Sequence, residues 1–146
     1  MKTKQHEDVF SALCKARKWK CTIQRRTVFN FIAGNTGHPS VEEACTAVRK
    51  TIPNISMDSI YRILNDFSTA GFLLRLEGCG RSHFDPNPSE HDHFYCVRCG
   101  RVYDIPGRVH SASKEQFASL GEVDFCEIRV TGTCKNCLSQ KKSTGK

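Results

Sequence analysis

The 146-residue sequence predicts an α+β fold built in two parts. Helical apolar spacing fills the first half of the chain, and two short apolar stretches around a glycine-containing turn follow it. Two C-x-x-C pairs mark the second half, where strands are expected around one helical segment. An apolar fraction of 38% suits two small domains, one of them held together by metal, better than one large core.

Four segments of the first part carry helical signals, at residues 9–19, 22–37, 40–53 and 56–71. Ser40 and Glu43 form a capping box at the start of the third segment, and Ser56 is an N-cap for the fourth. Gly71 stands where a C′ glycine ends a helix. We therefore expect three or four helices before the first strand.

Two strands, 72–76 and 82–85, are expected around the turn at residues 77–80. Helices followed by such a hairpin form a winged helix-turn-helix, in which the helix before the hairpin enters the DNA major groove. A basic band at residues 15–26 flanks this plan. Side chains on the band and on the exposed helix face are candidates for DNA contact: Lys20, Arg25, Ser56, Ser59, Tyr61 and Arg62.

The domain boundaries follow from composition. Residues 1–85 form the winged-helix domain, and residues 86–90, with two prolines, form a hinge. Residues 91–137 form a small α/β domain with strands at 93–96, 101–105 and 123–130 and a helix at 109–120. Residues 138–146 are basic and polar and are expected to be a disordered tail.

Bulk composition limits the function classes. A net charge of +7 favours a polyanionic partner, either nucleic acid or an anionic membrane surface. No apolar run approaches the length of a membrane span and the N-terminus lacks a signal-peptide pattern, so we expect a cytoplasmic protein. Nine cysteines are then not a disulfide framework. Five of them are isolated and are expected to be small apolar residues: Cys14, Cys21, Cys45, Cys79 and Cys126.

The remaining four cysteines predict a structural zinc site. Cys96 and Cys99 are separated by 34 residues from the second pair, Cys134 and Cys137. Each C-x-x-C pair supplies two thiolates to one tetrahedral ion, and four thiolates leave no open position for chemistry. A single pair would leave a redox dithiol open, whereas two pairs favour zinc.

Harder ligands lie beside the first cysteine pair and predict a second metal site. His91 and His93 point to one side of a strand, and Asp104 lies on the neighbouring strand. Asp85 ends the wing, and His38 lies between helices of the first part. Nitrogen and oxygen ligands of this kind suit Fe, Mn or a second Zn, and an ion shared by both domains would bias the hinge.

Six stretches of the chain carry a family resemblance. They are C-T-I-Q-R-R-T-V-F, G-H-P-S-V-E-E-A, N-I-S-M-D-S-I-Y-R-I-L-N-D-F-S-T-A-G-F, H-F-D-P, H-D-H-F-Y-C-V-R-C-G-R-V-Y-D-I and T-G-T-C-K-N-C. In their order and spacing the chain resembles the ferric uptake regulator (Fur) family over nearly its whole length. The resemblance implies a homodimeric, metal-dependent repressor with DNA-binding winged helices and dimerising C-terminal α/β domains, and not an enzyme.

The resemblance also implies roles for the candidate ligands. The four paired cysteines correspond to the structural Zn(2+) ligands, and a regulatory Fe(2+) or Mn(2+) ion corresponds to His38, Asp85, His91, His93 and Asp104. A homodimer of this family implies a double-stranded DNA operator, expected to be palindromic, as the partner.

Within the family, the chain is most similar to the peroxide-sensing PerR group. Asp104 stands where iron sensors usually carry glutamate, and T-x-Q-R around Arg25 is similar, although Ile23 replaces the usual proline. The implied mechanism is an iron-catalysed oxidation of a ligand histidine, His38 or His91, that releases the repressor from DNA.

Other readings stay open from the sequence. Tyr61-Arg62 is closer to iron-sensing members, and Cys79 lies near Asp85, where zinc sensors commonly carry a cysteine. A mononuclear metalloenzyme with His91, His93 and Asp104 around a water is a remote alternative. It needs a general base and a substrate cleft, and it leaves the basic winged helix unexplained.

Overall fold

The structure is a computed structural model, and it describes residues 2–78, 80–87, 89, 91–107, 114–122 and 128–142. The chain divides into two compact units, Met1–Pro88 and Ser89–Lys146, so the division lies within the stretch expected to be a hinge. Among the described residues, no helix combines the length and the apolar character that a membrane crossing requires.

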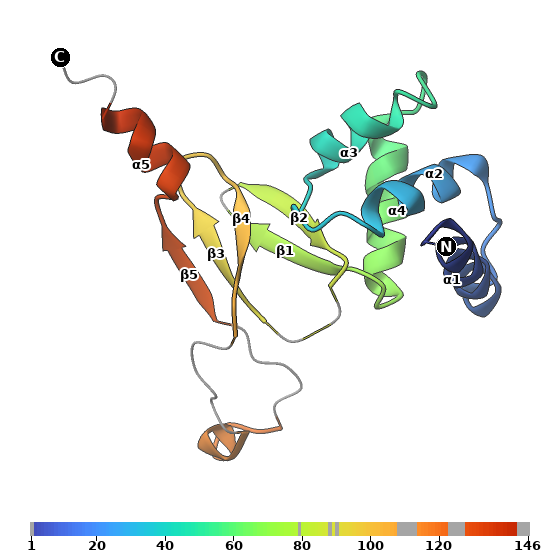
Figure 1. Cartoon of the computed structure of the whole chain (residues 1–146). Coiled ribbons are helices and arrows are strands. Elements are labelled where there is room, and N and C mark those ends of the chain that lie inside the picture. The colour runs from blue at the N-terminus through green and yellow to red at the C-terminus, as the bar shows by residue number, and fades with distance from the viewer. Residues whose placement is uncertain are drawn as a thin grey trace. The chain divides into compact units, whose positions relative to one another are not determined.

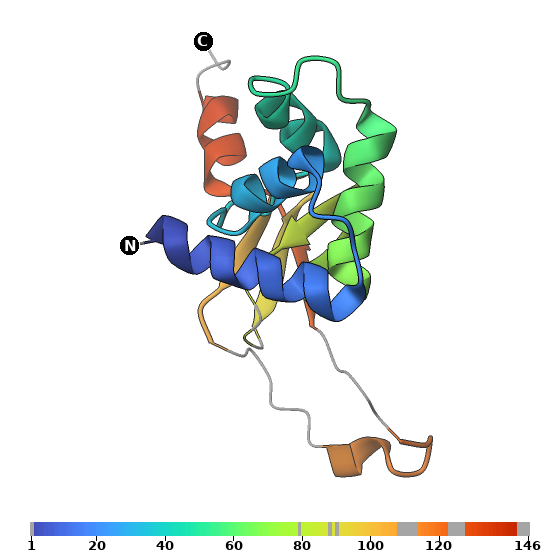
Figure 2. The same ribbon diagram turned by 90° about the vertical axis from the view of Figure 1, so that its right-hand side faces the viewer.

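The first unit has the winged helix-turn-helix order (Figure 1). Four helices precede an antiparallel hairpin: α1 Lys2–Arg17, α2 Ile23–Ile32, α3 Val41–Val48, α4 Met57–Thr69, β1 Leu74–Gly78 and β2 Arg81–Asp85. Figure 2 shows α1 running into the loop that leads to α2. The α1 helix begins at Lys2, earlier than the expected residue 9. Its first residues are polar, so they give no apolar period from which the sequence could predict them as helical.

Side-chain caps start the helices as the sequence predicts. The Ser40 hydroxyl accepts from the backbone N–H of Glu43, and the Glu43 carboxylate accepts from the Ser40 N–H, which completes the capping box. Ser56 caps α4 by accepting from the N–H of Ser59 at 3.1 Å. These bonds satisfy backbone donors that the first turn of a helix leaves open.

A Schellman motif ends α4 and sets where the wing begins. Gly71 has φ +77°, its N–H donates to the Ser68 carbonyl, and the Phe72 N–H donates to the Phe67 carbonyl at 3.0 Å. Leu73 also bonds back to Phe67, so β1 starts at Leu74 and not at residue 72 as the apolar run suggested.

The core of the first unit takes buried side chains from all four helices. Phe10, Phe29, Ala44 and Phe67 are almost completely buried, and Phe29 stacks on Phe72 with ring centroids 4.9 Å apart. Phe67 meets the same ring edge-on at 5.9 Å. This aromatic cluster fixes α2 against the C-terminal end of α4, mainly through removal of apolar surface from water.

The second unit contains a three-stranded sheet in the order β4-β3-β5, comprising β3 Asp92–Cys96, β4 Val102–Ile105 and β5 Arg129–Gly132. β3 pairs antiparallel with β4 and parallel with β5. The helix expected at 109–120 is a short 3₁₀ helix, Lys114–Phe117, in its described part, and residues 109–113 lie outside the described residues. The strand expected at 123–130 begins at Arg129, and residues 123–127 also lie outside.

The expected tail needs a correction. Helix α5 spans Lys135–Lys142, so residues 138–142 are helical and not irregular (Figure 1), while residues 143–146 lie outside the described part. The Leu138 N–H donates to the Cys134 carbonyl at 3.0 Å, so the second cysteine pair starts the helix. The polar composition of this segment suggested disorder. Composition gives no indication that the second cysteine pair starts a helix.

Gly71→Ala should destabilise the first unit by about 1–2 kcal/mol, because the left-handed conformation is costly for a residue with a Cβ. Nothing lies within 4 Å of a Cβ built on Gly71, so the cost comes from the backbone alone. Gly34→Ala is the matched control, since it has equal space and no positive φ. Urea unfolding followed by circular dichroism compares the two, and equal midpoints would contradict the expectation.

Candidate metal centres and nucleic-acid interface

The four cysteines predicted to bind zinc converge in the second unit. Cys96 ends β3, Cys99 follows in the turn, and Cys134 and Cys137 stand at the start of α5. The Sγ atoms of Cys96 and Cys137 are 3.9 Å apart, and those of Cys99 and Cys134 are 3.8 Å apart. A tetrahedron with ~2.3 Å zinc–sulfur bonds has edges of about 3.8 Å, so the cluster fits zinc without rearrangement.

Backbone N–H groups prepare Cys96 to ionise. Burial opposes its thiolate, but N–H donors from Cys134, Cys99 and Arg98 outweigh burial and lower the pKa of Cys96 to about 6. Burial and then the neighbouring thiols raise the pKa of Cys137 to about 12. One thiolate therefore suppresses the next until a cation neutralises the cluster, and zinc is such a cation.

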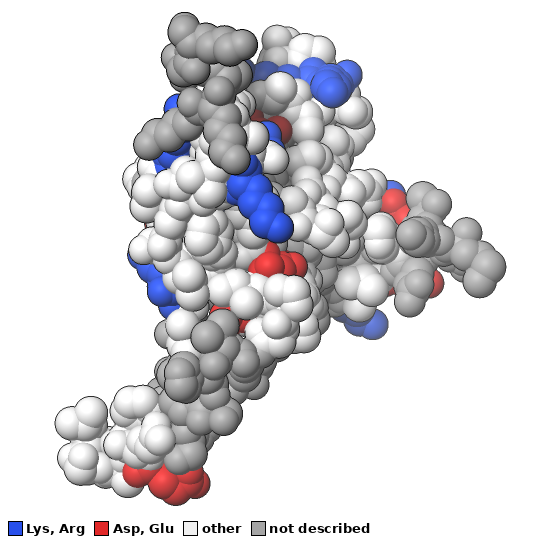
Figure 3. Space-filling model, turned by 60° about the vertical axis from the view of Figure 1, so that its left-hand side comes forward, with Lys and Arg blue, Asp and Glu red and all other residues white. Residues whose placement is uncertain are grey.

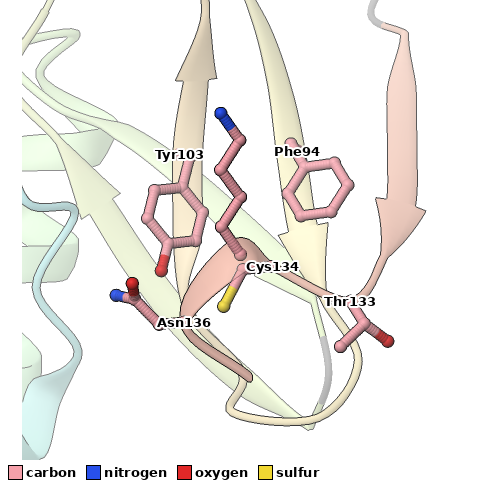
Figure 4. Close-up of a pocket in the computed structure, with 6 residues that line it drawn as sticks. Phe94, Tyr103, Thr133, Cys134 and Asn136 are labelled. Carbon is pink, nitrogen blue, oxygen red and sulfur yellow. The ribbon is translucent and has the colours of Figure 1, made fainter. Parts of the chain in front are cut away.

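Cys134 of the cluster lines a pocket of about 520 Å³. Figure 4 shows side chains that surround this pocket. Phe94 and Tyr103 come from neighbouring strands, and Thr133, Cys134 and Asn136 come from the segment that leads into α5. The backbone N–H of Cys137 and then the neighbouring Tyr103 hydroxyl lower the pKa of Cys134, and the neighbouring Cys134 thiol raises the pKa of Tyr103. The aromatic ring thus covers a cysteine that is already suited to metal, as expected for a closed structural site.

A second group of ligands lies in the same unit. His93 on β3 pairs in register with Asp104 on β4, so the two side chains share one face of the sheet. The Nε2 atoms of His91 and His93 lie 3.1 Å and 3.7 Å from Asp104 Oδ1. The ligand atoms of His91, His93 and Asp104 fall within 4.8 Å of one another.

The hydrogen bond of His91 orients its ring toward Asp104. His91 Nδ1 lies 2.7 Å from the Ser89 carbonyl, which only accepts, so Nδ1 carries the proton. His91 Nε2 faces the Asp104 carboxylate at 3.1 Å, and this contact is attractive when Nε2 carries a proton or when a cation binds both atoms. A metal-bound imidazole typically donates its other N–H to a carbonyl in this way.

His38 and Asp85 meet in the first unit. His38 Nε2 lies 3.7 Å from Asp85 Oδ2, and both side chains are 2% exposed. His38 has φ +50°, a conformation that favours glycine. His83 Nδ1–H donates to the His38 carbonyl at 2.7 Å, and the Phe84 N–H donates to the Pro39 carbonyl at 3.0 Å. His83, which sequence reasoning missed, thus holds His38 in an unfavourable backbone conformation beside Asp85.

The N-terminal half of α4 and the start of α2 line a groove of about 410 Å³ in the first unit. Arg25, Ser59, Tyr61 and Arg62 are four of the six predicted DNA-contact residues, and all four line it. Tyr61 is 38% exposed, and Arg62 extends into solvent beside Asp58, with which it forms an ion pair at 3.0 Å. The groove therefore offers donors and an aromatic ring on an exposed helix face.

The other two predicted contacts have different positions. Ser56 is committed to the cap of α4, and Lys20 is exposed in the loop before Thr22. Arg25 lines the groove, but its guanidinium forms an ion pair with Asp66 and lies 4.7 Å from the Trp19 ring centroid. Arg25 therefore braces α2 against α4 as well as facing the groove.

Arg75 on the wing is a further residue that the sequence did not single out. Its Nη1 donates to the Tyr61 hydroxyl at 3.1 Å and to the Asn65 side-chain oxygen at 3.2 Å. It also pairs with Glu77 and donates to the Ser82 hydroxyl at 3.2 Å. These bonds orient Tyr61 from the wing. The available signal was the period-two placement of Arg75 and Glu77 on one face of the strand.

Charged side chains are mixed on the face that Figure 3 presents. The described Lys and Arg side chains lie in separate clusters there, and acidic side chains lie between them. The excess positive charge of the chain thus does not form one continuous field on that face.

The first unit is a winged helix, a fold that binds DNA, and the second unit carries a four-cysteine cluster and a group of histidine and aspartate side chains. This combination is typical of a metal-binding transcription regulator. The ferric uptake regulator family model matches residues 16–131, which is more than half of the chain. The chain belongs to this family, whose members are metal-responsive repressors that bind DNA as dimers.

Individual relatives agree with this family assignment. The chain is 29% identical over 137 residues to the peroxide-responsive repressor PerR of Staphylococcus epidermidis, which covers 92% of this chain and 91% of that protein. It is similar in structure to the ferric uptake regulator of Vibrio cholerae, with 27% identity, a TM-score of 0.67 and coverage of 83% and 96%. The Helicobacter pylori ferric uptake regulator shares the fold, with a TM-score of 0.73 at 22% identity and coverage of 92% and 93%.

Loss of zinc should unfold the second unit and spare the first, because structural zinc contributes on the order of 10–16 kcal/mol in small zinc-binding peptides. Cys137→Ser should have the same effect as a chelator. Zinc retention should also fall as pH falls, since protons compete for the thiolates. Zinc content and limited proteolysis by mass spectrometry measure this. Cys21→Ser, at an exposed cysteine outside the cluster, is the control, and an intact second unit without zinc would contradict the expectation.

Proposed function

We propose that the chain is a metal-dependent DNA-binding repressor that senses peroxide through iron-catalysed oxidation of a ligand histidine. The observation that carries the proposal is the open set of nitrogen and oxygen ligands, in which His91 Nε2 faces the Asp104 carboxylate. Similarity to a peroxide-responsive repressor over 92% of the chain supports the choice of signal. Such a regulator works on chromosomal DNA in the cytoplasm.

The regulatory ion, in this proposal, takes ligands from both units. His38 and Asp85 contribute from the first unit, and His91, His93 and Asp104 contribute from the second. Mixed imidazole and carboxylate ligands suit Fe(2+) and Mn(2+), whereas the thiolate cluster keeps Zn(2+). Because each ligand group places an imidazole nitrogen near a carboxylate oxygen, an ion shared by both groups would favour the one arrangement that lets it bind both.

DNA binding depends on this arrangement. In a homodimer, two winged helices must face two operator half-sites at a fixed spacing, so a palindromic duplex is the expected partner. Ser59, Tyr61 and Arg62 on α4 would face the bases and phosphates, with Lys20 and Arg25 at the flanking backbone and Ser56 at the helix start. The Arg62 guanidinium is suited to hydrogen-bond guanine, and it must give up its ion pair with Asp58 to contact DNA.

The histidines are also the sensing residues. His38 and His91 would help to hold Fe(2+), and the ion would supply the redox chemistry that activates a peroxide. The imidazole of one of them would lose two electrons and gain one oxygen atom, and the other oxygen of the peroxide would leave as water. The altered ring is a poorer ligand, so the two units lose their shared restraint and the dimer leaves the operator.

Peroxide should release the iron-loaded protein from a palindromic operator and leave the manganese-loaded protein bound, because manganese does not split peroxide under the same conditions. Fluorescence anisotropy at several salt concentrations measures binding, and affinity should fall as salt rises. Mass spectrometry should find one added oxygen on His38 or His91 in the iron form only. Release with both histidines unmodified would disprove the mechanism.

Asp104→Glu should keep metal-dependent DNA binding and slow peroxide-driven release by about tenfold, equivalent to about 1.4 kcal/mol in the barrier. The longer arm moves the carboxylate relative to the imidazoles of His91 and His93. The matched control is Asp92→Glu, because Asp92 lies between the two histidines on the opposite face of β3. The measurement is the rate at which peroxide releases each iron-loaded variant from DNA. An unchanged rate for Asp104→Glu would remove this reason for proposing a peroxide sensor and not an iron sensor.

An iron-responsive repressor is the second candidate function. The V. cholerae ferric uptake regulator is similar over 83% of this chain at 27% identity, and Tyr61-Arg62 resembles the iron-sensing members. This candidate predicts operator binding that follows iron supply and ignores peroxide. The manganese and iron comparison above separates the two functions.

A further inference from the structure

A buried histidine on the wing, which is not one of the candidate metal ligands, contacts the segment that carries one of them. His83 lies on β2 and is 5% exposed, and its Nδ1 atom lies 2.7 Å from the His38 carbonyl. The next residue of β2, Phe84, donates its N–H to the Pro39 carbonyl at 3.0 Å, and Ser40 forms an antiparallel bridge with His83. Strand β2 therefore pairs with three consecutive residues that precede α3.

The side chain of His83 adds a bond that the backbone alone would not supply. A carbonyl oxygen only accepts, so Nδ1 of His83 carries the proton and donates to the His38 carbonyl. Burying a polar ring costs free energy unless a hydrogen bond compensates, and an apolar side chain would fill the same space without that cost. The bond to the His38 carbonyl is thus the contribution that a histidine makes at this position.

This bond restrains an unfavourable backbone conformation of His38. His38 has φ +50°, in the left-handed region where residues with a Cβ are uncommon. Its side chain is 2% exposed, and its Nε2 atom lies 3.7 Å from Asp85 Oδ2. Because the peptide group is planar, a fixed carbonyl also fixes the peptide plane that follows His38. Rotation of His38 toward extended backbone, which would move the imidazole relative to Asp85, is therefore opposed by His83.

The same strand orients the second candidate ligand of the first unit. Asp85 follows His83 by two positions, so both side chains lie on one face of β2, whereas Phe84 lies in the core. Asp85 Oδ1 accepts from the Asn87 N–H at 2.8 Å, while Oδ2 faces His38. Strand β2 thus supplies Asp85 directly and restrains His38 through His83.

We propose that His83 is a positioning residue for the regulatory ion. By donating to the His38 carbonyl, it holds the His38 imidazole beside the Asp85 carboxylate, and it acts through His38 and not as a ligand. Two ligands that the fold already holds together lose less conformational entropy when an ion binds them, so metal affinity rises. The role of His38 and Asp85 as ligands rests on the proposed function, whereas the hydrogen bond of His83 does not.

Two variants of similar size separate the hydrogen bond from packing. His83→Asn keeps an N–H donor at the position of Nδ1, whereas His83→Leu keeps a branched side chain without a donor. Full-length, zinc-loaded proteins are titrated with Mn(2+), and electron paramagnetic resonance measures the free ion. His83→Leu should bind Mn(2+) about tenfold more weakly than the parent protein, and His83→Asn should stay within about threefold of it, because groups that orient metal ligands change affinity by about 10–100-fold when lost.

Equal Mn(2+) affinities of the two variants would overturn the positioning role. Unfolding of His83→Leu, seen by circular dichroism, would also overturn it, since His83 would then support the whole first unit and not the ligand pair.

A second readout needs no regulatory metal. In the zinc-loaded protein without Mn(2+), nitrogen NMR should find the His83 imidazole as the Nδ1–H tautomer, and an Nε2–H tautomer would overturn the bond to His38. His38→Ala separates this proposal from the proposed function. If His38→Ala binds Mn(2+) as tightly as the parent protein, the proposed ligand set is wrong. If His38→Ala binds weakly while the two His83 variants remain equal, only the positioning role is wrong.

Discussion

Closely spaced ligand atoms are the constraint on which the second unit depends. Four sulfurs lie at the corners of a zinc-sized tetrahedron, and His91 Nε2 lies 3.1 Å from the Asp104 carboxylate. Four thiolates at this spacing repel one another unless a cation neutralises them, so zinc binding is expected to be coupled to folding of this unit. The aromatic cluster of the first unit needs no ion, since apolar burial alone holds it. This difference separates a self-sufficient helical unit from one that depends on its ligands.

The sequence predicted what local chemistry determines. The capping box at Ser40, the C′ glycine at 71 and the two cysteine pairs each follow from a few neighbouring residues, and each is found as expected. The placement of His93 opposite Asp104 followed from strand alternation and pairing. The start of β1 and the helix at Lys135–Lys142 did not follow, because one depends on bonds to a preceding helix and the other on a metal-binding turn.

Residues that act through other residues were the hardest to predict. His83 supports His38 through a backbone carbonyl, and Arg75 orients Tyr61 from a neighbouring strand. No local sequence motif marks these two supporting residues, because their partners lie 45 and 14 positions away in the chain. Arg25 illustrates the same point, because a residue predicted only as a candidate for DNA contact also joins Trp19 and Asp66. The sequence identified the ligand and contact types, and only the fold identified their supports.

The supports also separate the α4 groove from the metal ligands. Arg25 lies 4.7 Å from the Trp19 ring centroid and pairs with Asp66, and both Arg25 and Asp66 line the groove. This brace holds α2 against α4 through an ion pair and aromatic packing, and none of its three residues is a candidate metal ligand. Loss of a metal ligand would therefore leave the groove intact, and the proposed release from DNA would not require the first unit to unfold.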